Sequence, residues 1–582
     1  MKEFFTNEKN CQVVISLLKQ HGIRKIIASP GTTNTAFVVS IQRDKFFLVY
    51  SAVDERSAAY MAVGMSIESN EPVVLSCTGA TASRNYLPGL TEAFYRKIPV
   101  LAITSCQKYS SIGHHVAQVV DRSKIPNDVA RASFHLPIVK DQDDLWDCEV
   151  KVNSAILELT RSGGGPVHIN LPTTYEKPFS TRVIPTYRMI KRYRLEDDLP
   201  KLKGRVAIFV GSHKKWDERE SACLSALSEH IDAPVFCDHT SGYFGANRLL
   251  YSIAASQTMF DHSAYRPDIF IHIGEISGDY PSLNMAGREI WRVSEDGEIR
   301  DTFKKLKYVF EMGDEQFFCH YKKTSSRQQN GYFRMCADLL EDVRQGVPDL
   351  PFSNIWLASK LSGSLPKKSI VHLGILNSLR SWNFFELDES INASSNVGGF
   401  GIDGCLSTLI GASLVDRERL AYMVIGDLAF FYDMNILGNR HIDKNVRVLV
   451  INNGTGAEFK QYSHHAAYFG DTADELVSAT GHFGQKSRSL VRGFAESLGF
   501  EYFSASSKGE FEECFEKFVE ARISDKPIIV EAFTDAASES IALELMNTIK
   551  VSAAGRAKEI VKKVLGEERI KTIKNVVKSN TK

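Results

Sequence analysis

The sequence predicts an α/β protein with three open, mainly parallel sheets in series and a basic helical C-terminal tail. Short apolar runs such as KIIASPG and EPVVLSCTG stop at Gly, Pro or Ser and alternate with stretches of helical length. This alternation recurs in three successive regions, and 582 residues suffice for about three domains. Strands that are apolar throughout are typical of parallel sheets with helices on both faces.

The three regions follow one another with short breaks. We expect the first domain at 1–185, with strands at KIIASPG, EPVVLSCTG, KIPVLAITS and GGPVHINLP. The charged stretch MIKRYRLEDDLPKLKG (189–204) predicts a linker. The second domain is predicted at 195–335, with strands at RVAIFVGS, APVFCDHTSG, DIFIHIG and EIWRVSEDG. The third, at 350–545, contains SIVHLG, LAYMVIGDLA, VRVLVINNG and KPIIVEAF.

The tail at 546–582 differs in composition from the rest of the chain. It is rich in Lys and Arg and places apolar residues at helical spacing. This pattern predicts a basic amphipathic helix. Such a helix packs on the body of the protein or extends into solvent, and the other interpretation is a helix that docks on a partner or a membrane surface.

Composition limits the classes of function. Lys and Arg number 70 and balance 70 Asp and Glu, so charge gives no reason to expect nucleic acid as a partner. No run approaches the roughly 20 apolar residues of a membrane span, and MKEFFTNEKN lacks the apolar core of a signal peptide. The ten cysteines are scattered without a CxxC motif. We therefore expect a cytoplasmic protein with reduced thiols.

The strongest chemical motif spans residues 424–456, VIGDLAFFYDMNILGNRHIDKNVRVLVINNGTG. One apolar strand ends at Gly426-Asp427, and the next ends at Asn452-Asn453 before Gly454-Thr455-Gly456. A β-α-β crossover brings both ends to one edge of a sheet, where α/β proteins bind ligands. A carboxylate and an amide oxygen suit Mg²⁺, and glycine turns let backbone N–H groups approach phosphates. The plainer interpretation is that these are only turn residues.

A second motif, VYSAVDERSAAYMAVG, places Asp54 and Glu55 where an apolar strand precedes a small-residue helix. Together with the first motif it resembles the thiamin-diphosphate enzyme superfamily, whose order is pyrimidine-binding (Pyr), middle and diphosphate-binding (PP) domain. Within it, ASPGTTNTAF, NSLRSW, SNVGGFGIDGCLST and GDLAFFYDMNIL resemble MenD-type succinyl-enolpyruvyl-hydroxycyclohexene-carboxylate synthases. The resemblance covers about residues 5–540 and leaves the basic tail outside.

The resemblance implies roles for particular residues. Glu55 would hydrogen-bond the aminopyrimidine of the cofactor and favour its reactive tautomer. Asp427 and Asn453, with the carbonyl of Thr455, would hold Mg²⁺, and Ile402 would wedge the cofactor into its bent form. Further cofactor contacts are implied for Gly79, Asn85, Ser378, Gly426, Leu428, Ala429 and Gly456.

Catalysis by other side chains is also implied by the motifs. Gln118, in GHHVAQVVD, matches a glutamine that faces the reacting carbon. His114 and His115 could supply acid and base chemistry, or they are ordinary loop histidines. Glu458 follows the NNGTG loop, where the family presents apolar residues, and could be a proton donor or point into solvent. Phe459 beside it is a candidate substrate contact.

The substrate positions depart from the family pattern. Thr33, Trp382 and Val397 stand where MenD-type enzymes carry arginines that clamp polycarboxylate substrates. These three side chains cannot replace bidentate guanidinium groups. Arg380, two positions from one lost arginine, is a candidate for holding a single carboxylate. We therefore expect a donor smaller or less acidic than 2-oxoglutarate, such as pyruvate.

The resulting hypothesis is a thiamin-diphosphate- and Mg²⁺-dependent enzyme that decarboxylates a 2-oxo acid and passes the acyl carbanion to an acceptor, in secondary or polysaccharide metabolism. A simple 2-oxo acid decarboxylase is the alternative, and a catalytically silent regulatory paralogue is a third. Because Glu55 and Asp427 lie in different domains, the family resemblance implies a homodimer or homotetramer with active sites at the subunit interface. The middle region lacks a GxGxxG motif, so neither NAD nor FAD is indicated.

Overall fold

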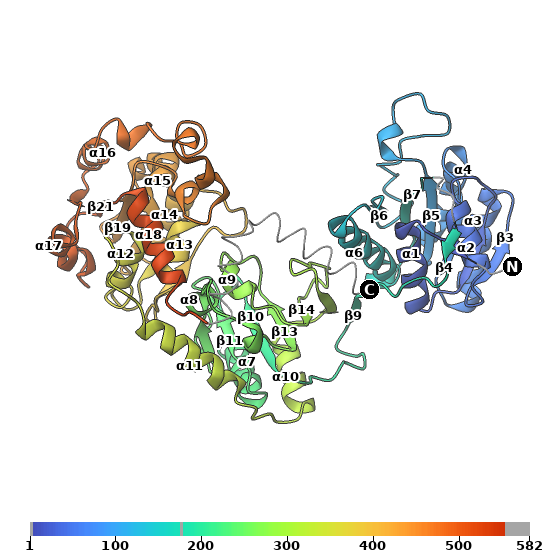
Figure 1. The fold of residues 1–582 in the computed structure, drawn as a ribbon, viewed down its shortest axis with the longest axis horizontal. Helices are drawn as coiled ribbons and strands as arrows, with labels where there is room; N and C mark the ends of the chain where they lie inside the picture. The colour runs from blue at the N-terminus through green and yellow to red at the C-terminus, as the bar shows by residue number, and fades with distance from the viewer. Residues whose placement is uncertain (1–3, 175–178, 553–582) are drawn as a thin grey trace. The chain divides into compact units, whose positions relative to one another are not determined.

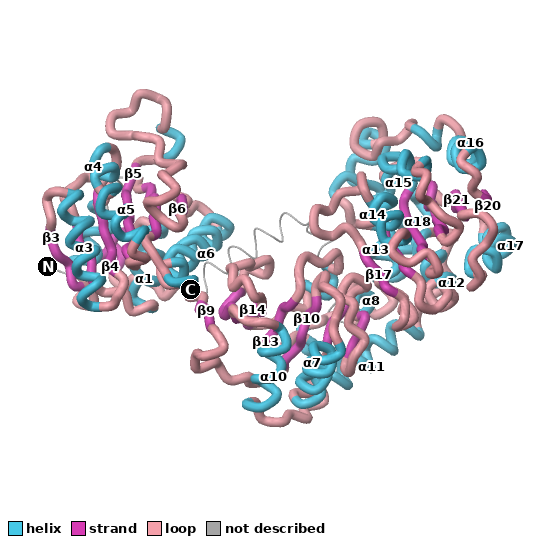
Figure 2. The backbone as a smooth tube through the Cα atoms, turned by 180° about the vertical axis from the view of Figure 1, so that it is seen from behind, coloured by secondary structure: helices cyan, strands magenta, loops and turns pink. Residues whose placement is uncertain are grey.

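The computed structural model describes residues 4–174 and 179–552. Its contacts divide the chain into two compact units, residues 1–197 with 296–311 and residues 198–295 with 312–582. Helices and strands alternate along both units, and the longer sheets are parallel (Figures 1 and 2). The predicted α/β class with three parallel sheets is confirmed. The predicted domain boundaries stay predictions, and the basic tail beyond Ser552 lies outside the described residues.

The first unit is built on a six-stranded sheet with the order β3-β2-β4-β5-β7-β6. All neighbouring strands in it are parallel. Its strands are β2 (Lys25–Ala28), β3 (Leu48–Ser51), β4 (Val73–Cys77), β5 (Val100–Cys106), β6 (Ser133–His135) and β7 (Val167–Pro172). Its helices are α1 (Lys9–Gln20), α2 (Thr35–Gln42), α3 (Glu55–Ser69), α4 (Thr81–Asn85), α5 (Leu87–Tyr95) and α6 (Gln142–Glu158).

Helices cover both faces of this sheet. Apolar residues of α1 and α6 pack with Val74, Leu101 and Ile103 on one face, whereas those of α3 and α5 pack with Val73 and Leu75 on the other. Neighbouring strand residues point to opposite faces, so one strand serves both cores.

Small residues bring α3 and α5 close together. A Cβ added to Gly89 of α5 would lie 2.5 Å from the Cβ of Ala59 of α3, so this contact requires glycine.

Short strands complete the first unit. β1 (Phe5–Thr6) pairs antiparallel with β8 (Phe179–Thr181), and β9 (Lys191–Tyr193) pairs in parallel with β15 (Leu306–Phe310). β9 lies in the stretch predicted as a linker, so part of that stretch is structured. The reason is local: Ile190 is fully buried, and the ring of Tyr193 stacks on Phe310 at 5.8 Å between centroids.

The second unit begins with a parallel sheet in which β12, β11, β10, β13 and β14 follow one another. Their bounds are β10 (Val206–Val210), β11 (Val235–Cys237), β12 (Arg248–Leu250), β13 (Ile269–Ile273) and β14 (Glu289–Val293). The accompanying helices are α7 (Glu218–His230), α8 (Ser252–Ala255), α9 (Tyr280–Leu283), α10 (Asp314–Thr324) and α11 (Tyr332–Gln345). β10 reads VAIFV and is buried along its whole length, as expected of a central parallel strand.

The rest of the second unit surrounds a six-stranded parallel sheet with the order β17-β16-β18-β19-β21-β20. The strands are β16 (Ile370–Leu373), β17 (Asn392–Ser394), β18 (Ala421–Gly426), β19 (Val446–Asn452), β20 (Glu501–Ala505) and β21 (Ile528–Phe533). The helices are α12 (Asn354–Leu361), α13 (Asn377–Trp382), α14 (Cys405–Ser413), α15 (Asp427–Asp433), α16 (Leu490–Ser497), α17 (Lys508–Val519) and α18 (Ala536–Asn547). Apolar residues of α12 and α17 join one core of this sheet and those of α14 and α16 join the other.

A buried arginine fixes one end of this sheet. Arg447 in β19 is fully buried, and its guanidinium donates hydrogen bonds to the hydroxyl of Tyr422 and to the carbonyls of Phe518, Glu520 and Arg522. Carbonyls at the C-terminal end of a helix carry partial negative charge, so the cation both satisfies and stabilises the end of α17. None of the helices in the described part of the chain is long and apolar enough to span a membrane.

Candidate active site

The carboxyl ends of β18 and β19 form one half of the candidate site. Gly426 ends β18, and Asp427 is the first residue of α15 with 6% of its surface exposed. Its Oδ2 accepts a hydrogen bond from the backbone N–H of Gly454 at 2.8 Å. The crossover therefore brings together the two ends of the sequence motif, as parallel pairing of β18 with β19 requires.

The loop after β19 is held by its own polar groups. The Asn453 side chain accepts from the N–H of Thr455 at 3.3 Å, and the Thr455 hydroxyl donates to the carbonyl of Ser478 at 2.9 Å. Gly454 has φ +71°, a conformation that L side chains rarely adopt. At Gly456 a Cβ would lie 2.9 Å from the Phe459 ring, so the Phe459 side chain folds over a position that only glycine leaves open.

A cavity of about 140 Å³ lies between these elements. Predicted cofactor and substrate residues line it together: Ser378, Ile402, Gly426, Asp427, Leu428, Ala429, Asn453, Thr455, Gly456, Glu458 and Phe459. These come from four separate segments of the sequence, and the fold brings them to one edge of the sheet.

Several residues that line this cavity were not predicted from the sequence, and three of them have notable contacts or backbone geometry. Glu539 of α18 is 4% exposed and accepts from the backbone N–H of Asn354 at 3.0 and 3.1 Å and from the Thr534 hydroxyl at 2.8 Å. Asn354 also donates to the Ser378 hydroxyl at 3.2 Å. Leu376 has φ +65° and ψ −113°, a strained conformation for a branched residue that occurs most often at functional sites. No motif marks these residues, because only the fold brings them to the pocket.

An ion pair occupies the side of the pocket near the candidate substrate residues. Arg380 donates through Nη2 to Oε1 of Glu458 at 2.9 Å and through Nη1 to Asn377 at 3.1 Å. Oε2 of Glu458 is buried and has no hydrogen-bond partner among the described residues. Glu458 therefore faces the pocket rather than solvent, and Arg380 is already engaged by a carboxylate of its own chain.

The positions of the missing arginines are buried. Thr33 is 4% exposed, and its hydroxyl contacts that of Thr78 at 2.6 Å and the carbonyl of Ser105 at 3.1 Å. Trp382 and Val397, at 0% and 3% exposure, belong to the core that covers one face of the β16–β21 sheet. None of the three side chains presents a charged group.

The first unit carries the other predicted residues. Asp54 is the N-cap of α3 and accepts from the N–H of Arg56 at 3.0 Å, which leaves Glu55 as the first helical residue. Glu55 is half-buried, and its Oε2 accepts from the Asn85 side chain at 3.3 Å. Gly79 follows β4 and precedes Ala80, whose φ of +58° and ψ of −137° are strained for a residue with a Cβ.

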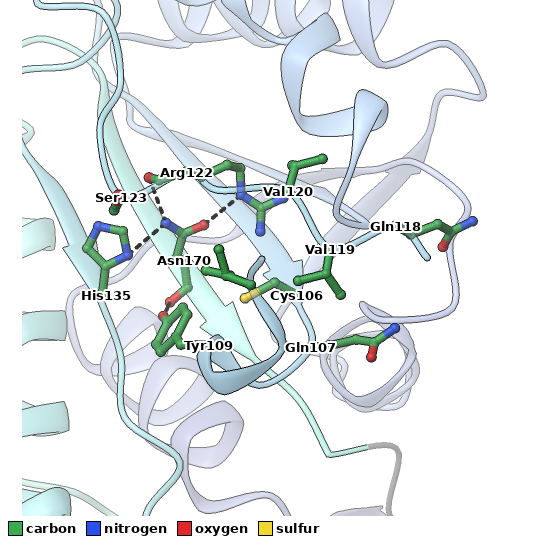
Figure 3. Close-up of a pocket in the computed structure, with 11 residues that line it drawn as sticks. Cys106, Gln107, Tyr109, Gln118, Val119, Val120, Arg122, Ser123, His135 and Asn170 are labelled. Atoms are coloured by element: carbon green, nitrogen blue, oxygen red, sulfur yellow. Dashed lines mark hydrogen bonds between the residues drawn. The ribbon is translucent and has the colours of Figure 1, made fainter. Parts of the chain in front are cut away.

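The segment after β5 carries the candidate acid–base residues. His114, His115 and Gln118 are all exposed, and both His115 and Gln118 have positive φ, 56° and 64°. Gln118 lines a second cavity, of about 220 Å³, at the carboxyl ends of β5, β6 and β7 (Figure 3). The structure thus brings Gln118 to a pocket, whereas neither histidine lines one that is described.

Comparison with known proteins gives this geometry its context. The N-terminal TPP binding domain of thiamine pyrophosphate enzymes matches residues 9–125. Synthases of 2-succinyl-5-enolpyruvyl-6-hydroxy-3-cyclohexene-1-carboxylate are similar over almost the whole chain. The Phocaeicola vulgatus protein is 30% identical over 564 residues, 93% of this chain and 98% of the relative. The chain belongs to this family.

More distant relatives extend the same match. The synthase of Bacteroides fragilis strain ATCC 25285 is 28% identical over 91% of this chain and 97% of its own, and that of Flavobacterium johnsoniae is 26% identical over 92% and 97%. The predicted resemblance to MenD-type enzymes and the predicted cofactor, thiamin diphosphate, are confirmed. Mg²⁺ is the usual partner metal of such enzymes.

The residues at the β18–β19 edge fit a diphosphate-bound cation. Asp427 pairs with no Lys or Arg within residues 4–174 and 179–552, and burial raises its pKa to about 7. A buried carboxylate without a counter-ion is costly, and a divalent cation would remove that cost. The carboxylate of Asp427, the amide oxygen of Asn453 and the Thr455 carbonyl are hard oxygen donors, which Mg²⁺ prefers.

Proposed function

We propose that this protein decarboxylates a small 2-oxo acid such as pyruvate and transfers the acyl unit to an acceptor. Thiamin diphosphate supplies the electron sink that makes loss of CO₂ possible. Glu55 would hold the aminopyrimidine through its carboxylate, and Asp427, Asn453 and the Thr455 carbonyl would hold Mg²⁺ and the diphosphate. Ile402 would support the bent cofactor, and Gln118 would face the reacting carbon.

The Arg380–Glu458 pair is the observation that supports a small donor. The relatives are named for a 2-succinyl product, and a succinyl group carries a carboxylate. In this chain the Arg380 guanidinium is already bound to Glu458, and Oε2 of Glu458 remains buried at the pocket without a partner. A second carboxylate on the donor would meet a like charge instead of an arginine fork.

Release of CO₂ from three 2-oxo acids tests the choice of donor. We expect pyruvate and 2-oxobutanoate to react with a higher kcat/KM than 2-oxoglutarate. The variant Glu458→Gln removes the like charge and should reduce the discrimination against 2-oxoglutarate, while Glu475→Gln, an exposed carboxylate outside the pocket, should not. A wild-type enzyme that prefers 2-oxoglutarate would refute the proposal.

Carboligation and simple decarboxylation are distinguished by products. With pyruvate and an added aldehyde we expect a hydroxyketone, because an acceptor competes with protons for the acyl unit. If acetaldehyde is the only product under every condition, the enzyme is a simple decarboxylase. If the purified protein binds no thiamin diphosphate in the presence of Mg²⁺, the silent-paralogue interpretation holds instead. We propose a homodimer or homotetramer as the active form, which size-exclusion chromatography with light scattering would test.

A further inference from the structure

The second cavity contains a buried cation that the proposed mechanism does not use. Arg122 lies in the segment that joins β5 to β6 and is 5% exposed. Its Nε donates to Oδ1 of Asn170 at 2.9 Å, and its Nη1 donates to the Ser83 hydroxyl at 3.1 Å. Both acceptors are neutral. No carboxylate pairs with Arg122 anywhere in the described ranges of the chain.

The remaining donors of Arg122 are available to the cavity. A guanidinium carries five N–H groups; Asn170 and Ser83 accept hydrogen bonds from two of them, and a third lies against the Cys106 thiol. Figure 3 shows the guanidinium inside the pocket, held by Asn170, with Cys106 and Val119 on its other side. Asn170 is itself fixed, because its amide donates to Nδ1 of His135 at 2.9 Å and its backbone carbonyl accepts from Tyr109. The cation is therefore positioned before any ligand binds.

No other lining group balances this charge. The titratable groups that face the cavity besides Arg122 are Cys106, Tyr109 and His135. Burial raises the pKa of the Cys106 thiol and of the Tyr109 hydroxyl and lowers the pKa of the His135 ring, so all three are neutral near pH 7. A buried arginine without an anion is energetically costly, and an anionic ligand would offset that cost.

The cavity borders the predicted site of reaction. A Cβ added to Gly79, a predicted cofactor contact, would lie 3.3 Å from Nη1 of Arg122 and 3.5 Å from the carbonyl of Gln118. Gln118 itself lines the cavity. Both features lie at the carboxyl edge of the same parallel sheet, where α/β proteins bind ligands.

We propose that Arg122 binds the carboxylate of the acceptor substrate, so that this enzyme joins its acyl unit to a carboxylate-bearing carbonyl compound. The inference rests on the proposed function. The carboxylate of a pyruvate-like donor leaves as CO₂, and a fixed cation on it would stabilise the ground state and slow that loss. A carboxylate that stays in the product can be bound by a fixed cation without slowing the loss of CO₂. Because a monocarboxylate donor loses its only carboxylate, a carboxylate that remains must belong to the acceptor.

Matched acceptors test the inference. Pyruvate is the donor, and 4-oxobutanoate and butanal are the two acceptors compared. Both have the same chain length and the same aldehyde, but the far end is a carboxylate in 4-oxobutanoate and a methyl group in butanal. We expect wild-type kcat/KM to favour 4-oxobutanoate by about 10- to 100-fold, the range of one charge-assisted contact. The variant Arg122→Met should remove most of that preference through KM, and Lys124→Met, an exposed cation in the same segment, should retain it.

A second measurement needs no variant and remains available if Arg122→Met fails to fold. Butanoate should inhibit the wild-type reaction competitively against 4-oxobutanoate, and butanamide at equal concentration should not. Equal use of both acceptors by the wild-type enzyme, or equal inhibition by both compounds, would overturn the inference. Release of CO₂ from pyruvate without acceptor tests the donor reaction separately, so its loss would count against the proposed function and not against Arg122.

Discussion

Replacement of Glu539 by Gln should change how the stability of the second unit depends on pH. The Glu539 carboxylate is 4% exposed, and burial raises its pKa from 4.5 to about 7 despite hydrogen bonds from Asn354 and Thr534. Since the folded form binds the proton more tightly than the unfolded chain, its contribution to stability is complete below about pH 4.5. That contribution is lost as the pH rises through about 7.

The size of the effect follows from the pKa difference. About 2.5 pH units at 1.36 kcal/mol each amount to roughly 3 kcal/mol for the wild-type protein between pH 4.5 and 7.5. Gln keeps the size of the side chain and an acceptor oxygen but does not titrate. Relative to wild type, Glu539→Gln should therefore gain about 3 kcal/mol over this range.

Native-state hydrogen exchange of peptides from α18 measures this difference without assuming that the whole chain unfolds in one step. The protein should be free of cofactor and metal, because a cation on Asp427 would alter the field at Glu539. Glu544→Gln, an exposed carboxylate on the same helix, is the matched control and should show no trend with pH. A stability difference between Glu539→Gln and wild type that stays constant from pH 4.5 to 7.5 would refute the reasoning.

Three further predictions concern the cofactor site. Glu55→Gln should lower kcat at least 100-fold, measured by turnover, while thiamin diphosphate still binds, measured by calorimetry. The control Asp54→Asn should keep activity because Asn also caps helices. Equal kcat for Glu55→Gln and wild type would contradict the role assigned to Glu55. Asp427→Asn should weaken Mg²⁺ binding with cofactor present by at least about 10-fold, and an unchanged titration would exclude Asp427 as a ligand. Gly456→Ala should lower Tm, because the added Cβ would press on Phe459 and the Ser478 carbonyl. The control Gly411→Ala should raise stability by up to about 1 kcal/mol, because Gly411 lies on an exposed turn of α14 with open space around it.

Local pattern was enough to predict the alternation of strands and helices and the β18–β19 edge. An apolar run such as VRVLVIN specifies a strand buried on both faces, and its terminal polar residues then lie at the carboxyl edge. The resemblance in the motifs around Glu55 and Asp427 identified the cofactor before the fold was known.

Other parts of the site depend on contacts between distant segments. Glu539 reaches Asn354 across 185 positions, and Arg122 reaches Asn170 across 48. The Arg380–Glu458 pair joins residues 78 positions apart, and the sequence left open whether Glu458 faces solvent. Burial and pairing of single polar groups follow from packing, which hydrophobic periodicity does not specify.

The burial of Arg447 has a consequence for which mutations the chain can accept. Apart from the Tyr422 hydroxyl, every acceptor of its guanidinium is a main-chain carbonyl, at Phe518, Glu520 and Arg522. The Phe518 side chain packs in the core, but Glu520 and Arg522 are exposed, and exchange of these two side chains leaves their carbonyls where they are. A deletion or insertion between residues 518 and 522 would move the carbonyls away from a fully buried cation. Residues 520–522 should therefore vary freely in sequence but not in length.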